Sequence, residues 1–214
     1  MEQRKFESKN RYLISLIIGT LVFLLVFAIS YSVSYFEFQR VSNLQVGVGY
    51  DIFKDKLDYS FFKEDICGTE SFEKVSQDLG FQGRIIDDLE RKFGKQDEDV
   101  LLRKQFYSLI ELEHFEFVKT YNEKCGNKID TILFFYSNNA SEIEDSEEAG
   151  RILGVVSSRN DNLIIYSFDI DLDSDLVDKL EKNYNITDPP VAVINEKAKI
   201  ELPANIQEIE RHLR

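Results

Sequence analysis

The segment from Leu13 to Ser34 contains no charged residue, no histidine and no side-chain amide, and this run of 22 residues constrains the chain most. A helix of about 20 apolar residues is long enough to cross the hydrocarbon core of a bilayer. Tyr31, Tyr35 and Phe36 then supply the aromatic belt that is typical of the end of a span. The sequence therefore predicts one transmembrane helix over residues 12–36.

A cleaved secretory signal is the alternative interpretation of the same segment. Ala28-Ile29-Ser30 is a weak version of the small-x-small cleavage pattern. However, a signal peptide has an apolar centre of only about 7–15 residues, and here the apolar run continues to Phe36. An uncleaved anchor is the favoured prediction.

The charges that flank the apolar run predict its orientation. Arg4, Lys5, Lys9 and Arg11 precede it, whereas basic residues are sparse directly after it. Because basic residues are retained on the cytoplasmic side, residues 1–11 are predicted to be a cytoplasmic tail. The rest of this single-pass cell-membrane protein is then extracytoplasmic.

The part of the chain after the apolar run is strongly acidic. Residues 37–214 hold 22 basic and 37 acidic residues, a net charge of −15. Such a surface repels nucleic acids and anionic lipid head groups. No glycine-rich phosphate loop and no GxSxG motif occurs, so the sequence predicts no catalytic residue and no cofactor. Residues 37–65 have no clean periodicity and are predicted to be a juxtamembrane linker.

Apolar residues at helical spacing predict a first helix over Ser71–Phe93, interrupted at Gly80 and Gly83. Gly94 is a typical stop signal after the last residue of a helix. These features place the start of a helical hairpin within residues 66–126.

A second helix is predicted over Val100–Tyr121, with Asp97 and the acids after it as the cap and first-turn charges. Two helices joined by a short connection normally pack antiparallel. The apolar face predicted for this second helix contains Leu102, Phe106, Leu109, Ile110 and Phe117.

Cys67 and Cys125 are the two cysteines of the chain, and they flank the predicted pair of helices. Antiparallel packing brings the start of the first helix beside the end of the second, which favours a disulfide between them. An extracytoplasmic location permits such a bond. A redox couple or a sensor thiol is the alternative, although the cysteines lack CxxC proximity and neither has a histidine nearby in the sequence.

Residues 127–214 have the pattern of a mixed α/β domain. Two strands in parallel should alternate with helices, followed by two antiparallel strands and a last helix. The predicted elements are strands at Ile129–Tyr136, Leu163–Phe168, Val191–Asn195 and Lys197–Glu201, and helices at 141–156, Asp171–Asn183 and Ile206–Leu213. Ser141 to Glu144 match a capping box at the start of the first of these helices.

This order resembles the thioredoxin fold over residues 129–214. The segments ILFFYSN, YSFDIDLDSDLVDKLEKNYNI and DPPVAVIN carry the resemblance. It implies a cis peptide bond at Pro190, ahead of the third strand. It also implies a CxxC motif after the first strand, but Ala140 and Ile143 stand at those positions and Phe134 replaces the buried acid. The resemblance therefore implies a redox-inactive member.

The family holds extended polypeptide in the groove beside this proline. On this chain the implied groove consists of Asn139, Ala140, Pro190 and Val191. The sequence thus predicts a membrane-anchored, non-enzymatic protein that binds an unidentified protein partner or scaffolds a membrane complex. A thiol-disulfide oxidoreductase or redox sensor that uses Cys67 and Cys125 is one alternative, and a structural envelope component is another.

The sequence also bears on two further kinds of site, glycosylation sites and metal sites. Asn139 and Asn185 begin N-x-S/T motifs and are possible glycosylation acceptors. The alternating carboxylates from Asp169 to Asp175 lack the glycine and closing glutamate of an EF-hand, and are predicted to be a solvated turn and helix start. His114 and His212 lack zinc-site spacing and are predicted to be surface or capping residues, so no metal site is predicted.

Overall fold

The computed structural model describes residues 11–36, 67, 69–126 and 128–213. The predicted tail before Arg11 and the predicted linker 37–65 lie outside these residues. The chain divides into two compact units, residues 1–44 and residues 45–214.

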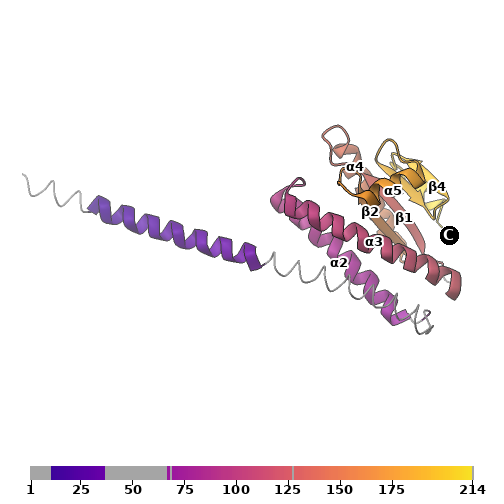
Figure 1. The fold of residues 1–214 in the computed structure, drawn as a ribbon, viewed down its shortest axis with the longest axis horizontal. Helices are drawn as coiled ribbons and strands as arrows, with labels where there is room; N and C mark the ends of the chain where they lie inside the picture. Colours follow the sequence, from indigo (N-terminus) through magenta and orange to yellow (C-terminus); the bar gives the residue numbers. More distant parts are fainter. Residues whose placement is uncertain (1–10, 37–66, 68, 127, 214) are drawn as a thin grey trace, which may run out of the picture. The chain divides into compact units, whose positions relative to one another are not determined.

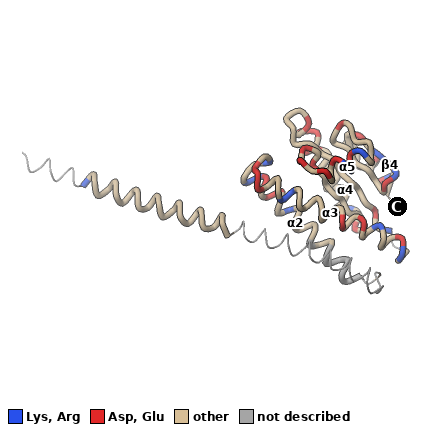
Figure 2. Tube along the Cα trace, viewed as in Figure 1, with Lys and Arg blue, Asp and Glu red and all other residues tan. Residues whose placement is uncertain are grey.

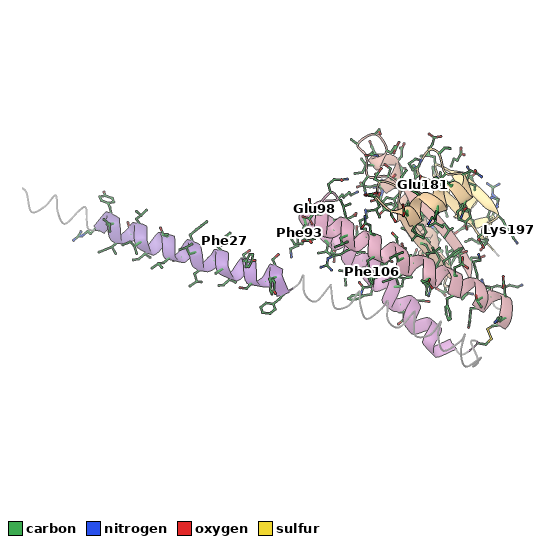
Figure 3. The ribbon with its side chains drawn as sticks, in the orientation of Figure 1. Phe27, Phe93, Glu98, Phe106, Glu181 and Lys197 are labelled. Carbon is green, nitrogen blue, oxygen red and sulfur yellow. A yellow bond between two sulfur atoms is a disulfide. The ribbon has the colours of Figure 1, made fainter. Side chains whose placement is uncertain are left out.

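The first unit contains one helix, Arg11–Phe36, of 26 residues. It is long and apolar enough to cross a membrane, and its large apolar side chains, such as Phe27, are exposed (Figure 3). In Figure 2 no residue of this helix has the colour of Asp and Glu, whereas many residues of the second unit have it. Because water solvates such a surface poorly, this helix could span a bilayer.

The second unit is a mixed α/β structure around a four-stranded sheet in the order β2-β1-β3-β4. β1 pairs with β2 in parallel and β3 pairs with β4 antiparallel, as the sequence predicted. β3 also pairs with β1 antiparallel. The strands are β1 Asp130–Tyr136, β2 Leu163–Asp169, β3 Val191–Ile194 and β4 Ala198–Glu201. The helices are α2 Thr69–Phe93, α3 Glu98–Cys125, α4 Ile143–Arg159, α5 Asp175–Tyr184 and α6 Ile206–Glu210.

Helices cover both faces of the sheet (Figure 1). On one face, buried residues of α2, α3 and α5 pack against strand residues such as Leu133 and Phe135. On the other face, α4 and α6 pack against Ile132 and Phe134. Successive side chains of a strand point to opposite faces of the sheet. The four central residues of β1, Ile132 to Phe135, are all apolar, so β1 is buried on both faces.

α2 and α3 pack against each other along the same side of the second unit (Figure 1). Gly94 follows α2 with a φ of 99°, a left-handed conformation that suits glycine. Asp97 caps α3 by accepting hydrogen bonds from the backbone N–H groups of Asp99 and Val100. Both helix boundaries therefore use the residues that the sequence indicated.

The glycines of α2 do not interrupt it, contrary to the prediction, because the helix is continuous from Thr69 to Phe93. Gly83 instead allows a close approach. A Cβ at this position would lie 2.8 Å from the Tyr107 hydroxyl, which donates a hydrogen bond to the Leu79 carbonyl at 3.2 Å. A Cβ at Gly80 would meet no atom nearer than 3.8 Å.

This contrast predicts opposite effects of two alanine substitutions. Gly80→Ala should raise the free energy of unfolding by about 0.5–1 kcal/mol, because alanine favours the helix. Gly83→Ala should lower the free energy of unfolding by about 1 kcal/mol or more relative to the wild type, because the Tyr107 hydroxyl must give up its hydrogen bond. Circular dichroism during chemical unfolding measures both values, and Tyr107→Phe should relieve the penalty of Gly83→Ala. Equal stabilisation by the two alanines would contradict this account.

The apolar face predicted for α3 is largely wrong. Leu102, Phe106 and Leu109 are exposed (Phe106 is labelled in Figure 3), and of the predicted set only Ile110 is fully buried. The buried face instead includes polar and ionisable residues: Arg103, Lys104, Ser108, Glu111 and His114. α3 is therefore oriented by polar partners on the strands as well as by apolar packing.

Three boundaries in the α/β part also differ from prediction. The capping box at Ser141 does not form, because α4 begins at Ile143 and its N-cap Glu142 makes no side-chain cap hydrogen bond. The backbone N–H groups of Glu142 and Ile143 both donate to the Asn139 carbonyl at 2.9 Å, which closes the turn instead. α5 begins at Asp175 rather than Asp171, and α6 ends at Glu210 rather than Leu213.

Candidate functional site

The end of β1 and the beginning of β3 lie at the same edge of the sheet. Phe135 pairs with Val191 in antiparallel register, so the loop after Tyr136 and the segment before Val191 leave the sheet together. The peptide bond between Pro189 and Pro190 is cis, as predicted at Pro190. This edge is the candidate functional site that the sequence indicated.

The four residues of the predicted groove differ in accessibility. Asn139 and Ala140 are exposed in the loop after β1, whereas Pro190 and Val191 are buried. Val191 lies between Phe135 and Glu201 in the sheet, and the Pro190 carbonyl accepts a hydrogen bond from the Leu202 N–H at 2.9 Å. The accessible surface of this edge therefore comes mainly from the β1 loop.

Asp171 holds the loop after β1 in place. Its carboxylate accepts hydrogen bonds from the Ser137 hydroxyl at 3.0 Å, the Asn138 backbone N–H at 2.6 Å and the Asn139 side-chain amide at 2.5 Å. Ionised acceptors form the stronger class of hydrogen bond. One carboxylate from the segment after β2 thus positions three consecutive loop residues.

Asp169 is buried, so the predicted solvated turn is wrong at this position. Its side chain accepts hydrogen bonds from the Asn138 amide at 2.7 Å and from the Asp171 backbone N–H at 3.0 Å. It also forms an ion pair with the ammonium group of Lys104, and Asp169 and Lys104 are only 2% and 4% exposed. The Lys104 ammonium lies 2.6 Å from a carboxylate oxygen of Glu90 as well.

Sequence reasoning did not find this buried ion-pair centre, which we define as Lys104, Glu90 and Asp169. Lys104 and Asp169 are separated by 65 residues, so no local pattern joins them. Asp169 connects this centre to the loop after β1, because the same carboxylate accepts the Asn138 hydrogen bond.

His114 is fully buried, which corrects its predicted surface position, whereas His212 is exposed as predicted. Its Nε2 lies 3.0 Å from the Ser76 hydroxyl and its Nδ1 lies 2.9 Å from the Tyr166 hydroxyl. Burial lowers the pKa of His114 to about 4, so the ring is neutral at pH 7. His114 therefore connects α2, α3 and β2 through uncharged hydrogen bonds.

The lowered pKa of His114 predicts a loss of stability in mild acid. In the unfolded chain the imidazole takes up a proton below about pH 6.5, whereas in the folded protein it does so only near pH 4. Between these values the unfolded state binds more protons, so the free energy of unfolding should fall by about 3 kcal/mol as the pH decreases. Comparison with His114→Gln isolates this contribution, and parallel pH profiles for the two proteins would contradict it.

Cys67 and Cys125 form a disulfide, which confirms the predicted pairing (Figure 3). Their Cα atoms are 5.4 Å apart, although the residues are 58 positions apart in the sequence. The bond joins the segment before α2 to the last residue of α3. Since the chain has two cysteines, neither remains as a thiol in this structure.

Both glycosylation motifs have exposed asparagines. The side-chain nitrogen of Asn139, to which a glycan would be attached, donates a hydrogen bond to the Asp171 carboxylate. Asn185 follows α5 with a φ of 52°, a left-handed conformation that asparagine tolerates. No group of three metal-ligating side chains lies together within the described part of the chain.

Comparisons of this chain with known protein families, with curated proteins and with solved structures find no match.

Proposed function

We propose that this chain is a single-pass membrane protein that presents a redox-inactive, thioredoxin-like domain outside the cytoplasm and binds a protein partner there. In this proposal the helix Arg11–Phe36 is the anchor and α2 and α3 form a helical hairpin. The four basic residues before or at the start of that helix orient the N-terminus toward the cytoplasm. An oxidising compartment would preserve the disulfide.

One observation carries the proposal. The parallel pairing of β1 with β2, the antiparallel pairing of β3 with β4 and the cis proline directly before β3 support the proposal. The loop that would hold the catalytic cysteines contains Asn139 and Ala140 instead, and the sequence has no cysteine after Cys125. These facts support a binding role for this edge and disfavour thiol chemistry there.

The geometry also indicates how a partner would be held. β3 is paired on both sides, so a bound peptide cannot add to it as a further strand. Pro189 has no N–H and can offer only its carbonyl. Binding should therefore depend on the side chains of the loop after β1, which Asp171 holds in a defined conformation. Preorganisation of this kind reduces the entropy lost on binding.

Photocrosslinking in native membranes tests this proposal. A benzophenone amino acid at Ala140 of the full-length protein should give a discrete crosslinked partner. The same probe at Lys197, an exposed residue in the turn at the opposite end of β3, should not. Identical products from both positions would contradict a binding edge at Ala140.

Thiol titration distinguishes the oxidoreductase alternative. The proposed function requires that Cys67 and Cys125 stay bonded in mild reductant and that the protein shows no disulfide-exchange turnover. Rapid reversible reduction accompanied by turnover would favour an oxidoreductase instead. Labelling of an added cysteine from either side of the membrane checks the orientation, and a cytoplasmic second unit would exclude the proposed location.

A further inference from the structure

A cleft of about 470 Å³ lies beside β2, the edge strand of the sheet, and Asn138 from the loop after β1 contributes to its lining. Its other walls come from α2, α3, the two parallel strands and the beginning of α4. Lys95 and Glu147 form an ion pair of 2.8 Å on its wall. Gly80 forms part of the α2 wall, and a Cβ there would meet no atom nearer than 3.8 Å.

The charges around this cleft do not balance. In its buried part, the carboxyl groups of Glu90 and Asp169 share the ammonium group of Lys104. Glu111 adds a third buried carboxyl group to the lining, whereas on the wall Glu147 is paired with Lys95. Since buried carboxylates require a cationic or hydrogen-bonding partner, the interior of the cleft holds more acidic groups than cationic ones.

Glu111 supplies an independent observation. It is 2% exposed, and one carboxyl oxygen accepts a hydrogen bond from the Ser167 N–H on the edge of β2 at 2.9 Å. The other oxygen, Oε2, is buried and has no hydrogen-bond partner among the described residues. A buried polar atom without a partner is unfavourable, and natural proteins rarely retain one without a functional reason.

The shape and lining of the cleft distinguish between kinds of cation. The described residues bring no three His, Cys, Asp or Glu side chains together to hold a metal ion. The cleft is large enough for an organic molecule, and three aromatic residues, Tyr107, Phe134 and Tyr136, line it. The Lys104 ammonium group already lies 5.3 Å from the centroid of the Tyr136 ring. Aromatic faces attract alkylammonium groups as well as their carbon chains.

From this geometry we infer that the cleft is a binding site for a small organic ammonium ion, which donates a hydrogen bond to Oε2 of Glu111. Burial raises the pKa of Glu111 well above its ordinary value, which favours the protonated form of this carboxyl in the empty cleft. An incoming ammonium ion favours the carboxylate, so the proton leaves to the solvent as the ligand binds. This inference does not depend on the proposed function.

Isothermal titration of the full-length protein in detergent tests the inference. The probes are spermidine and agmatine, each titrated at pH 7 in two buffers that differ in ionisation enthalpy. At least one probe should bind saturably with one molecule per chain and release up to one proton. If neither of the two binds saturably at millimolar concentration, the inference is overturned.

Two glutamine variants distinguish binding in the cleft from binding to the acidic surface. Glu111→Gln keeps the shape and should weaken binding by about 10- to 100-fold, since a charge-assisted hydrogen bond is lost. Glu208→Gln removes the same charge from an exposed position on α6 and should leave the affinity unchanged. Equal affinities for the wild type and Glu111→Gln, or equal losses in the two glutamine variants, would show that the cleft is not the site.

Gly80→Leu provides a test that leaves Glu111 intact. A side chain at this position would extend from the α2 wall into the cleft without a backbone clash. Binding of the probe should fall by about tenfold or more, while circular dichroism confirms that the variant is folded. Undiminished binding by a folded Gly80→Leu protein would place the ligand elsewhere.

Discussion

Replacement of Lys104 by methionine should lower the free energy of unfolding by about 3–5 kcal/mol, because it leaves two carboxylates without their cation. Glu90 is partly buried and Asp169 is fully buried, so water cannot replace the ammonium group at Asp169. The methionine side chain is similar in length and preserves most of the apolar packing. Chemical unfolding of the full-length protein in detergent, followed by circular dichroism, measures the change.

Lys119→Met is the matched control for this prediction. Lys119 also pairs with two carboxylates, those of Glu116 and Glu196, but its side chain is 34% exposed. Exposed ion pairs contribute only about 0–1 kcal/mol. Adding Glu90→Gln and Asp169→Asn to Lys104→Met should recover much of the lost stability, because the unpaired charges are removed. Similar losses for Lys104→Met and Lys119→Met would contradict the role assigned to the buried centre.

Replacement of both cysteines by alanine should lower the free energy of unfolding by about 4 kcal/mol. The disulfide closes a loop between residues 58 positions apart, and the chain-entropy estimate for a loop of this length is about 4 kcal/mol. The unfolded chain gains this freedom when the bond is absent. The same unfolding assay, performed on the wild-type protein without reductant and on Cys67→Ala/Cys125→Ala, measures the effect.

Full reduction of the wild-type protein offers an internal control. The reduced wild type and the double alanine variant should unfold at the same denaturant concentration, because both lack the cross-link. A loss below about 1 kcal/mol would contradict the chain-entropy account. It would mean that residual contacts between the segments of α2 and α3 already restrict the unfolded chain. Retained binding at the Ala140 edge by the double variant would show that the disulfide has a structural role only.

The buried polar residues of α3 explain how this helix is placed. Lys104 reaches Asp169, Glu111 accepts from the Ser167 N–H, and His114 contacts Tyr166. All three partners belong to β2, an edge strand whose unpaired backbone groups need cover. α3 thus covers the edge strand β2 with its polar side chains. Because this face of α3 is turned toward β2, Leu102 and Phe106 are left exposed.

The sequence by itself determined the local features of this protein. A long charge-free run, strands with apolar residues on both faces, Gly94 and Asp97 at helix ends, and Pro189-Pro190 before a strand all depend on neighbouring residues. The pairing of Cys67 with Cys125 could also be predicted, because the short connection between two helices constrains where their far ends lie.

Only the tertiary structure decided which face of α3 is buried and where the charged groups lie. Periodicity favoured Leu102, Phe106 and Leu109, yet Lys104, Glu111 and His114 are buried instead. A lysine or glutamate can be buried only beside a suitable partner, and here the partners lie 52 to 65 residues away. Local patterns contain no information about such partners, so the cleft and its buried centre emerge only when α3 meets the edge of the sheet.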